Sequence, residues 1–429
     1  MREIGVGLLG LGVVGSEVAN ILLQRSGRLS EQVGASVSVK RILVRDPNKQ
    51  RPFPFPATLL TTDVSEILGD PSIDIVVELI GGEQPALDYM KKAITNCKHV
   101  VTANKEVIAK MGFKMLSLAA QHGVDLRYEA SVCSGIPILS PLQQDLAANE
   151  INAIRAIVNG TTNYILTKMA REGLPYEQAL RQAQELGYAE TDPTNDVEGI
   201  DATYKLAILA SLAFHTPVRP SSIYRQGISG LDPKDFTYAH ELGYSVKLLA
   251  IAKRQGDALE ARVHPTLTSL ETQLATVDGV YNAVQIEGDL VGTLMFYGRG
   301  AGGGPTSSTV VADVLTIARS IAMEGIIRPR IELNRRIPVI PMADIQTRYY
   351  FRLSVADQPG VLAQIARVLG DHRISISSVI QKELDPDAQT AQVVILTHPS
   401  VEQSVQSAVA ELAALPLINH VGALIRVEH

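Results

Sequence analysis

The stretch GVGLLGLGVVGSEV, residues 5–18, decides how the N-terminal part of this chain folds. An apolar run leads to Gly10, and Gly12 and Gly15 complete a G-x-G-x-x-G pattern before a helical pattern begins. Glycine permits a tight turn and a close approach of the backbone to a pyrophosphate, whose charge a helix N-terminus stabilises. A purely structural glycine turn is the alternative, but the strand-turn-helix context favours dinucleotide binding.

Short β-branched runs and helical patterns alternate through residues 1–130, as they do in a parallel sheet covered by helices. We predict an α/β fold in which 1–130 form a Rossmann-type nucleotide-binding domain. Four apolar runs between residues 240 and 297 predict an antiparallel sheet, so we expect 131–305 to be an α+β domain for substrate binding, catalysis and dimerisation. A further strand-rich segment is expected at 126–138.

The C-terminal part divides into three predicted segments. We expect a helix within 306–330 that returns to the nucleotide-binding domain, followed by a proline-containing linker at 331–348. Residues 349–429 show signals in the order β-α-β-β-α-β, which predicts a small ferredoxin-like domain.

Composition limits the classes of partner. The chain has 429 residues, 46% of them hydrophobic, and a formal net charge of −6, so it lacks the excess of Lys and Arg that nucleic acids or acidic membranes attract. Cys97 and Cys133 cannot form a disulfide framework, and the N-terminus enters a strand pattern without a signal peptide. No uncharged apolar run reaches about eighteen residues. We expect a cytoplasmic protein that binds a small molecule, with no nucleic acid and no membrane.

Two predicted strands end in residues that suit a cofactor. Arg45 stands where an NAD enzyme carries an acid, and an arginine there faces a 2′-phosphate, so NADP is favoured. Alternatively Arg45 pairs with Asp46 or solvent, and Asp46 leaves NAD use open. Thr102 and Lys105, in VVTANK, follow another strand at the edge where ligands bind. Lys105 then reaches nicotinamide or substrate, or is simply a solvated lysine at a helix start.

The stretch ELGYAETDPTNDVEGIDATYK, residues 185–205, gathers six acidic residues before one lysine. Asp201 and Lys205 are four residues apart and share a predicted helix face, a combination suited to a proton donor or shuttle. The remaining acids, above all Glu190 and Asp196, exceed what one lysine neutralises and suit a substrate with an ammonium group, such as an amino acid. The alternatives are an exposed acidic loop with an ordinary salt bridge, or a calcium loop, which lacks the EF-hand glycine.

Two other segments offer weaker signals. Cys133, in EASVCSGIP, is either a nucleophile or, as we favour, a buried inert thiol, and Glu129 with nearby carbonyls could cage a monovalent cation. In the C-terminal domain, Pro359 and Gly360 form a turn before a helix whose free N–H groups suit a carboxylate. The alternative for this domain is a module that only dimerises.

Several stretches together resemble homoserine dehydrogenase over essentially the whole chain. They are GLLGLGVVGSEV, VVTANKEVIA, YEASVCSGIPI, NGTTNYIL, ELGYAETDPTNDVEGIDATYKLAILA and GRGAGGGPTSS, and the tail resembles an ACT domain. The resemblance implies NADPH- or NADH-dependent, reversible reduction of L-aspartate 4-semialdehyde to L-homoserine in threonine, methionine and isoleucine biosynthesis. A non-catalytic nucleotide and amino-acid sensor is the alternative class, and an ACT-bearing phosphoglycerate dehydrogenase is a rival enzyme whose fingerprint lies deeper in the chain.

The resemblance also implies roles for individual residues. Lys205, Lys105 and Asp201 are implied as catalytic, and the substrate-binding set is Glu190, Asp196, Asp201 and Tyr188. The implied cofactor-binding residues are Gly10, Leu11, Gly12, Val13, Val14, Gly15, Arg45, Thr102, Lys105 and Gly302. A monovalent cation such as Na⁺ is implied at Glu129, Val132, Ser134 and Ile136, where Cys133 departs from the family pattern of small residues.

The ACT-like tail implies regulation. L-threonine is the expected effector, and its implied site is the turn formed by Asp357, Gln358, Pro359, Gly360 and Val361. Such tails pair with one another, so a homodimer or homotetramer is expected.

Overall fold

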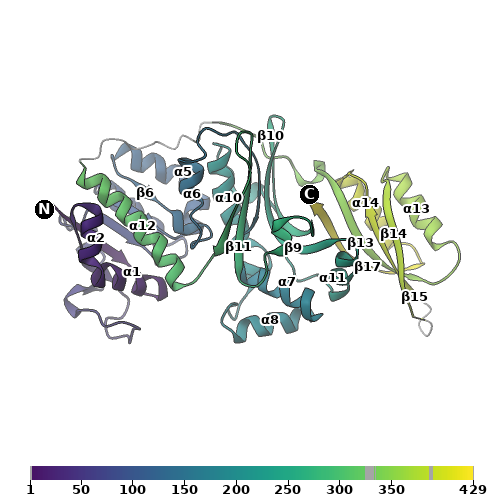
Figure 1. Cartoon of the computed structure of the whole chain (residues 1–429), viewed down its shortest axis with the longest axis horizontal. Helices are drawn as coiled ribbons and strands as arrows, with labels where there is room; N and C mark the ends of the chain where they lie inside the picture. The colour runs from purple at the N-terminus through teal and green to yellow at the C-terminus, as the bar shows by residue number, and fades with distance from the viewer. Residues whose placement is uncertain (1, 324–332, 334, 386–389, 429) are drawn as a thin grey trace. The chain divides into compact units, whose positions relative to one another are not determined.

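Figure 1 shows the computed structural model of the chain, which describes residues 2–323, 333, 335–385 and 390–428. Its contacts divide it into two compact units. The first unit comprises Met1–Ile151, Tyr204–Pro220 and Gly288–Arg336, and the second comprises Asn152–Thr203, Ser221–Glu287 and Ile337–His429. The division falls within helix α10 (Ile200–Ala213), so one continuous helix contributes residues to both units.

A parallel six-stranded sheet is the centre of the first unit. Its strands lie in the order β3-β2-β1-β4-β5-β6, and the registered neighbours all run in parallel. The order reverses between β1 and β4, and open α/β sheets bind ligands at the carboxyl ends of strands beside such a switch point. The strands are β1 (Glu3–Leu9), β2 (Ser36–Leu43), β3 (Leu60–Thr61), β4 (Ile75–Glu78), β5 (His99–Thr102) and β6 (Leu126–Arg127).

Three helices share one hydrophobic core with β1, β2 and β4: α1 (Val13–Gln24), α2 (Ser26–Val33) and α12 (Gly303–Ala322). Helix α1 buries Val18, Ala19 and Leu22, which recur at helical spacing on one face. Helix α12 comes from far along the chain, yet it lies against α1 (Figure 1) and contributes Val310, Val314 and Ile317 to this core. The first unit also contains α3 (Ser65–Leu68), α4 (Ala86–Thr95), α5 (Lys105–Gln121), α6 (Leu139–Gln143) and β12 (Gly292–Arg299).

A mixed sheet runs through the second unit in the order β11-β7-β9-β10-β17-β13-β15-β14. Strands β9 and β10 pair antiparallel along their whole length, which confirms the antiparallel prediction for this part of 240–297. The strands are β7 (Ile151–Ile157), β9 (Tyr244–Gln255), β10 (Ala258–Ser269), β11 (Tyr281–Gly288), β13 (Gln346–Ala356), β14 (Ile376–Asp385), β15 (Thr390–Thr397) and β17 (Ile418–Glu428), with short β8 (Tyr224–Arg225) and β16 (Ser400–Val401) beside them.

The predicted β-α-β-β-α-β domain is present at the C-terminal end of the second unit. Helices α13 (Val361–Asp371) and α14 (Glu402–Ala413) lie side by side (Figure 1) and share a core with the strands through Phe351, Ile365 and Val405. The remaining helices of this unit are α7 (Gly160–Glu172), α8 (Tyr176–Glu185), α9 (Thr194–Val197) and α11 (Pro233–Glu241). The predicted mixed α/β fold, with a ferredoxin-like β-α-β-β-α-β unit at its C-terminal end, is therefore confirmed.

Strand β17 belongs to two pairings at once. It pairs antiparallel with β13 inside the C-terminal domain, and it pairs in parallel with β10, where Thr266 registers with Arg426. The C-terminal domain is thus continued into the neighbouring sheet by backbone hydrogen bonds, which the sequence analysis did not anticipate.

Buried ion pairs reinforce this junction. The Glu428 side chain is 4% exposed; one carboxylate oxygen accepts from Arg155 Nε at 2.9 Å and pairs with Lys253, and the other accepts from Arg262 Nη2 at 3.1 Å. Burial alone would raise the pKa of the Glu428 carboxyl, but Lys253, Arg262 and Arg155 together hold it below its ordinary value. The C-terminal end of strand β17 is therefore held by ion pairs as well as by backbone hydrogen bonds.

A second buried carboxylate joins α11 to the C-terminal sheet. Asp235 is fully buried and accepts from the Tyr350 hydroxyl at 3.0 Å and from Arg352 Nε at 2.8 Å. The same carboxylate accepts from the backbone N–H of Asp232 and completes a capping box at the start of α11. Helix α11 is consequently fixed to β13 by its first turn.

The strand-rich segment expected at 126–138 is wrong beyond its first two residues. Only Leu126–Arg127 form a strand, and Glu129–Ser131 form a 3-10 turn. The Glu129 carboxylate accepts the backbone N–H groups of Ile138 and Leu139, which draws the chain into a loop instead of an extended run.

Parts of two other predicted segments lie outside the described residues. These are 324–330 of the returning helix, and 331, 332 and 334 of the linker. Within the described part of the chain, no helix is long and apolar enough to cross a membrane.

We predict that Glu428→Gln destabilises the protein by about 3 kcal/mol at pH 7, because breaking a buried ion pair leaves charges uncompensated. Since the folded-state pKa of Glu428 is lowered, its stabilisation is present above the ordinary glutamate pKa and is lost as pH falls, so wild type and variant should converge towards pH 4. Thermal unfolding at pH 7 and pH 4 measures this. Glu172→Gln, in the exposed pair with Lys168, is the control and should cost under about 0.5 kcal/mol. An equal loss at both pH values would contradict the ionic role.

Candidate active site

The turn between β1 and α1 requires glycine at two of its three glycine positions, Gly10 and Gly15. Gly10 has φ +105°, and a Cβ on Gly15 would lie 2.3 Å from the Gly10 carbonyl oxygen. Gly12 is the N-cap of α1, whose first residues Val13 and Val14 present backbone N–H groups at the helix start. The turn lies at the carboxyl end of β1, beside the switch point of the sheet. This is the geometry in which a helix N-terminus receives a phosphate.

A second glycine-rich helix start lies against the first. Gly302 has φ +119° and is the N-cap of α12. A Cβ on Gly303 would lie 2.4 Å from Glu17 Oε1, and Ser307 Oγ donates to the Val14 carbonyl at 3.4 Å. The sequence analysis selected Gly302 only by resemblance, and the structure brings it beside the α1 turn. Two positive helix ends therefore meet at one place.

Arg45 is exposed just beyond the carboxyl end of β2. The loop after it is organised by its own side chains, because Asp46 accepts from the Asn48 N–H at 2.8 Å and Arg51 donates to the carbonyls of Asp46 and Lys49. The Arg51 guanidinium is thus bound to carbonyls of the loop, and the Asp46 carboxylate is bound to the backbone N–H of Asn48. Arg45 is left as the arginine whose position suits a nucleotide phosphate.

The side chains of Thr102 and Asn104 form hydrogen bonds with other groups of the protein. The Thr102 hydroxyl donates to Glu78 Oε2 at 2.6 Å and accepts from the Asn104 N–H at 2.9 Å. Asn104 caps α5 by accepting from the Val107 N–H, and its amide donates to the Gly82 carbonyl at 2.7 Å. These bonds tie the end of β5 to the loop after β4 and fix the start of α5, whose first residue is Lys105.

Glu78 is a buried carboxylate that the sequence analysis missed. It is fully buried at the end of β4, and its Oε1 accepts from the Ile80 N–H at 2.7 Å. Together with Thr102 it holds the loop through Gly81 and Gly82, both at positive φ. Its signal in the sequence was an acid at the end of an apolar strand, three residues before the first of two consecutive glycines.

The Glu129 carboxylate, predicted to bind a cation, instead accepts hydrogen bonds from the loop and the start of α6. Glu129 accepts from the N–H groups of Ile138, Leu139 and Ser140 and from the Ser140 hydroxyl, all within 2.6–2.7 Å. Both carboxylate oxygens therefore serve the start of α6. Among the described residues, no group of three or more His, Cys, Asp or Glu side chains is placed to hold a metal ion.

The loop that follows Glu129 is joined to the glycine-rich start of α12. Ser134 Oγ lies 2.8 Å from Thr306 Oγ1 and donates to the Gly300 carbonyl at 3.0 Å. A Cβ on Gly135 would lie 2.2 Å from the Arg299 carbonyl oxygen, so glycine is required there. Cys133 is buried between Val132 and Ser134, as the inert-thiol interpretation expects.

Asp313, on α12, also contacts this loop. It accepts from the Glu129 N–H at 3.0 Å and lies 3.7 Å from Arg127 Nη1. Burial raises the pKa of Asp313 to about 7, although Arg127 acts in the opposite direction. The middle of α12 is therefore attached to the same loop as its first turn.

Two predicted carboxylates of the second unit meet at one amide. Asn159 Nδ2 donates to Asp196 Oδ1 at 2.7 Å and to Asp201 Oδ2 at 2.8 Å. Asp201 is 2% exposed and Asn159 is 5% exposed, whereas Asp196 is half-buried. Asn159 is also the N-cap of α7. The structure thus brings together two of the predicted acids, and sequence reasoning missed the residue that joins them.

Glu190 and Tyr188 lie on the exposed side of the same region. Glu190 is exposed, and its carbonyl accepts from Gln184. The Tyr188 ring lies 5.1 Å from that of Tyr164 on α7, and the Tyr188 carbonyl accepts from the Thr161 hydroxyl at 2.7 Å. The loop that carries both residues is thereby fixed to the first turn of α7, next to Asn159.

Helix α10 carries Asp201 and Lys205 one turn apart, so they share a helix face as predicted. In the first unit, the neighbouring Tyr204 ring lies 5.7 Å below Lys110 Nζ, which places α10 beside α5. Lys110 itself is held by Glu83 and Glu106. The two lysines that the sequence analysis selected, Lys105 and Lys205, therefore lie on two helices that pack together.

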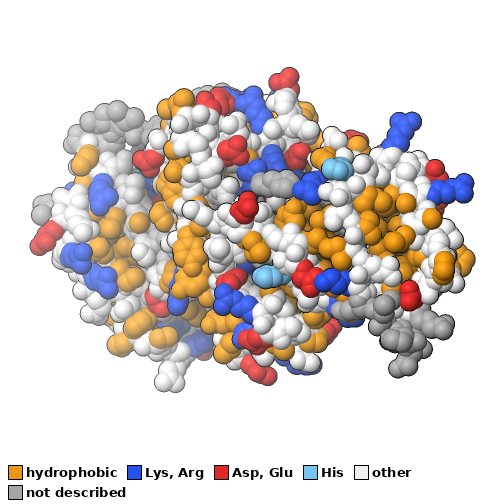
Figure 2. All heavy atoms as spheres, turned by 45° about the vertical axis from the view of Figure 1, so that its right-hand side comes forward, with side chains coloured by type: hydrophobic (Ala, Val, Ile, Leu, Met, Phe, Trp, Pro, Cys, Tyr) orange, Lys and Arg blue, Asp and Glu red, His pale blue; other side chains and the backbone are white. Residues whose placement is uncertain are grey.

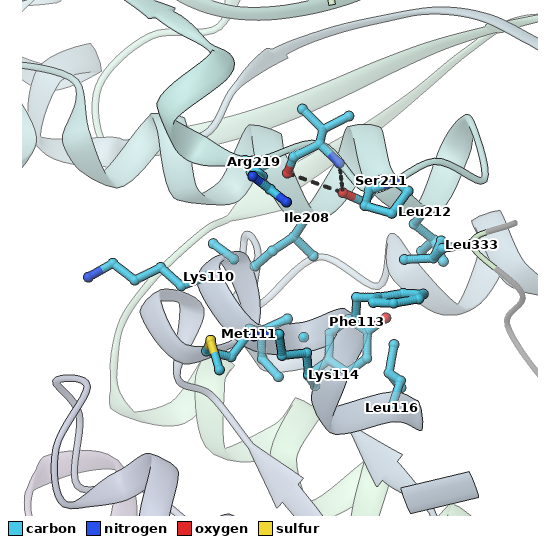
Figure 3. A pocket seen from close by; sticks show the side chains of 17 residues that line it. Lys110, Met111, Phe113, Lys114, Leu116, Ile208, Ser211, Leu212, Arg219 and Leu333 are labelled. Carbon is cyan, nitrogen blue, oxygen red and sulfur yellow. Dashed lines mark hydrogen bonds between the residues drawn. The ribbon is translucent and has the colours of Figure 1, made fainter. Parts of the chain in front are cut away.

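A pocket of about 240 Å³ opens between α5 and α10 in the first unit. Figure 3 shows Phe113, Ile208, Leu212 and Leu333 around it, with Lys110 extending away. None of the predicted site residues is among those that line it. The pocket is therefore separate from the predicted cofactor and substrate residues.

The predicted regulatory turn joins β13 to α13. Asp357, Gln358, Pro359 and Gly360 are exposed, and Gly360 is the N-cap of α13 with φ +93°. Val361 begins the helix and is buried in the core of the C-terminal domain. The turn thus presents the first N–H groups of α13 next to an exposed aspartate.

Comparison with known proteins identifies close relatives. A family model described as homoserine dehydrogenase matches residues 137–315, one described as the homoserine dehydrogenase NAD-binding domain matches 10–129, and one described as the ACT domain matches 349–416. The homoserine dehydrogenase of Neisseria gonorrhoeae is 41% identical over 433 residues, covering 100% of this chain and 99% of that protein.

Solved structures agree with the sequence matches. The crystal structure of a homoserine dehydrogenase from Thiobacillus denitrificans has a TM-score of 0.93 at 41% identity, covering 100% of this chain and 99% of that one. A hyperthermophilic archaeal homoserine dehydrogenase in complex with NADPH has a TM-score of 0.63 at 26% identity, covering 77% of this chain and 100% of that one.

Proposed function

Because this chain belongs to the homoserine dehydrogenase family, we propose that Lys205 transfers the proton of its reaction while Asp201 and Asp196 hold the substrate. The protein is an NAD(P)-dependent oxidoreductase that interconverts L-aspartate 4-semialdehyde and L-homoserine. Two observations carry the proposal. Asn159 donates hydrogen bonds to both Asp196 and Asp201, and Asp201 lies one helical turn before Lys205 on α10.

For the cofactor, we propose that the pyrophosphate lies on the first turn of α1, from Gly10 to Gly15, with Gly302 at the adjoining start of α12. A Cβ on Gly15 would lie 2.3 Å from the Gly10 carbonyl oxygen, so glycine permits the tight turn that lets the backbone at the start of α1 approach a pyrophosphate. Arg45 then binds the 2′-phosphate and makes NADP the favoured cofactor, with NAD as the alternative. Thr102 supports this region through Glu78.

For the substrate, we propose that its α-ammonium group binds the carboxylates of Asp201 and Asp196, with Glu190 and Tyr188 completing the site. Both homoserine and aspartate semialdehyde carry this ammonium group, and two carboxylates within hydrogen-bond distance of one amide form a strong cation site. Asp201 is almost fully buried, so its charge is poorly screened and favours a buried cation partner.

For the chemical step, the bound NAD(P)H supplies the hydride that becomes the new C–H bond of the alcohol. Lys205 donates a proton to the aldehyde oxygen as this oxygen becomes a hydroxyl, and in the reverse direction it removes that proton. Asp201, one turn earlier on the same face, favours the charged lysine. Lys105, fixed at the first turn of α5 by the Asn104 cap, orients the reacting carbonyl.

We also propose that a monovalent cation binds the loop that follows Glu129. Glu129 already accepts four hydrogen bonds, so a cation on its carboxylate would compete with those donors. We therefore assign such an ion to the backbone carbonyls of Val132, Ser134 and Ile136, and we keep Glu129 as the residue that shapes their loop.

We propose that L-threonine regulates the enzyme at the turn from Asp357 to Val361. The N-terminus of α13 receives the carboxylate of threonine, and Asp357 receives its ammonium group.

We also propose a homodimer or homotetramer that pairs through β14, the strand at the end of the sheet order. Figure 2 shows hydrophobic side chains gathered on the right of the view, where the C-terminal domain comes forward, and Leu362, Val379 and Val401 are 39–43% exposed. A cytoplasmic location is proposed because neither Cys97 nor Cys133 forms a disulfide.

The first prediction concerns the proton. Lys205→Ala should lower kcat by roughly 10² to 10⁴ while leaving the KM for NADPH nearly unchanged, because only the proton transfer is lost. Steady-state kinetics in both directions measures this. Lys168→Ala, which removes a lysine from the pair with Glu172, is the control and should retain wild-type kinetics. A Lys205 variant with near-normal turnover would exclude the assignment.

The second prediction concerns the cofactor. Arg45→Ala should raise the KM for NADPH by roughly tenfold or more with little effect on the KM for NADH, because only NADPH carries the 2′-phosphate that a guanidinium binds. Arg28→Ala, an exposed arginine on α2, is the matched control. Equal changes for the two cofactors would mean that Arg45 is an ordinary surface charge.

The third prediction concerns regulation. Threonine should inhibit the wild-type enzyme by lowering its affinity for substrate about 5- to 150-fold, the range of typical allosteric coupling. Asp357→Asn should weaken threonine binding, because the ammonium group of threonine loses its carboxylate partner. Titration of activity with threonine measures this for the whole chain. Asp371→Asn, at the other end of α13, is the control. If neither threonine nor a related amino acid changes wild-type activity, the domain is an assembly module.

A further inference from the structure

Asn159 holds two carboxylates that repel one another. Its Nδ2 group donates one bond to Asp196 and one to Asp201, at 2.7 and 2.8 Å, so both protons of a single amide are used on two acids. The three residues come from different elements, since Asn159 precedes α7, Asp196 lies in α9 and Asp201 lies in α10. The amide is therefore the point at which these elements are joined.

The orientation of this amide is fixed by its other end. Asn159 Oδ1 accepts from the Thr162 backbone N–H at 2.9 Å and lies 3.1 Å from the Thr162 hydroxyl. A flipped amide would turn its oxygen towards two carboxylates and its NH₂ group towards a backbone N–H. Both changes replace hydrogen bonds with repulsion, so only one orientation satisfies the site.

The chemistry of an amide suits this position better than that of a cation. A lysine or arginine here would neutralise Asp196 and Asp201 and leave little charge for a substrate ammonium group. An amide donates two hydrogen bonds but carries no net charge, so the pair of carboxylates is oriented without being neutralised. Asn159 is only 5% exposed, so its bonds are made with little competition from water.

Capping of α7 alone does not require asparagine. Serine, threonine and aspartate satisfy an N-cap about as well, because the cap needs only one acceptor. The donors of Asn159 serve Asp196 and Asp201 and contribute nothing to the cap.

We propose that Asn159 is a positioning residue for the reaction: it sets the spacing and orientation of Asp196 and Asp201 so that they receive the α-ammonium group of homoserine. The inference rests on the proposed role of these two aspartates. Asn159 acts through them and does not itself touch the substrate.

The test is Asn159→Asp, which is nearly isosteric and keeps a good N-cap but replaces the two donors with a third carboxylate. The KM for homoserine should rise by about 10- to 100-fold, as expected for the loss of charge-assisted hydrogen bonds. The KM for NADP⁺ should stay within about twofold, because the nucleotide residues belong to the first unit. Thermal unfolding measured in parallel separates this split from a general loss of stability.

Asn163→Asp is the matched control. Asn163 lies one turn further along α7, is 1% exposed, and uses its amide on the carbonyls of Val277, Gly279 and Tyr281, so the same substitution disturbs the helix without touching the aspartates. The KM for homoserine should respond to Asn159→Asp and not to Asn163→Asp. A similar rise in both variants would assign Asn159 a structural role and overturn the proposal.

A neutral variant covers the case in which Asn159→Asp does not fold. Asn159→Ser keeps the cap, adds no charge and cannot bridge both aspartates, so it should show the same direction of change in the KM for homoserine. A wild-type KM in the serine variant would overturn the proposal.

Asp201→Asn separates this inference from the proposed function. If Asp201→Asn raises the KM for homoserine while the Asn159 variants do not, the binding role of Asp201 stands and only the positioning role fails. If Asp201→Asn leaves that KM unchanged, the proposed substrate site fails and the role of Asn159 fails with it.

Discussion

The contact between one amide and two carboxylates is the constraint on which the proposed substrate site depends. Asp196 and Asp201 repel one another, and the repulsion is strong because Asp201 is excluded from water. Asn159 makes this arrangement stable and is itself fixed by the first turn of α7. The position of α7 therefore decides the geometry of the acids, and any element that moves α7 acts on them.

The contacts of α7 extend towards the C-terminal domain within the second unit. Helix α7 packs against α11, and α11 begins at the capping box that contains Asp235. Asp235 in turn accepts from Tyr350 and Arg352 on β13, the strand that leads into the proposed threonine turn. Packed elements thus connect the proposed regulatory turn with Asn159. An effector would act through them by favouring one arrangement of these elements over another.

The C-terminal domain is consequently more than an appended module. Strand β17 contributes to the sheet of β10, and its Glu428 neutralises part of the charge of Arg155, Lys253 and Arg262. Removing the domain would expose an edge of β10 and leave these cations without their carboxylate. Point substitutions in the turn are therefore a better probe of regulation than deletion of the domain.

Structural features that are set by a local sequence pattern were predicted. Features that depend on residues far apart in the sequence were missed. The glycine spacing from Gly10 to Gly15 is set by the turn itself, and the helical spacing of Asp201 and Lys205 is set by one helix, so both were readable. The parallel pairing of β17 with β10 joins residues about 160 positions apart and has no local signal. Asn159 was visible only as a residue inside a family motif, because its importance comes from two acids 37 and 42 residues away.

The same acids explain how such a site would discriminate between substrates. The neutral Asn159 amide orients Asp196 and Asp201 but supplies no positive charge to them. At the proposed site, a ligand with an α-ammonium group would add positive charge beside these carboxylates, and an analogue without that group would not. A site built to bind a polar group rejects analogues that lack that group much more strongly than an apolar pocket rejects a missing methylene. The proposed pairing of Asp196 and Asp201 on Asn159 would therefore act as a specificity device, because an amino-acid substrate brings a cation to these two acids and an uncharged analogue does not.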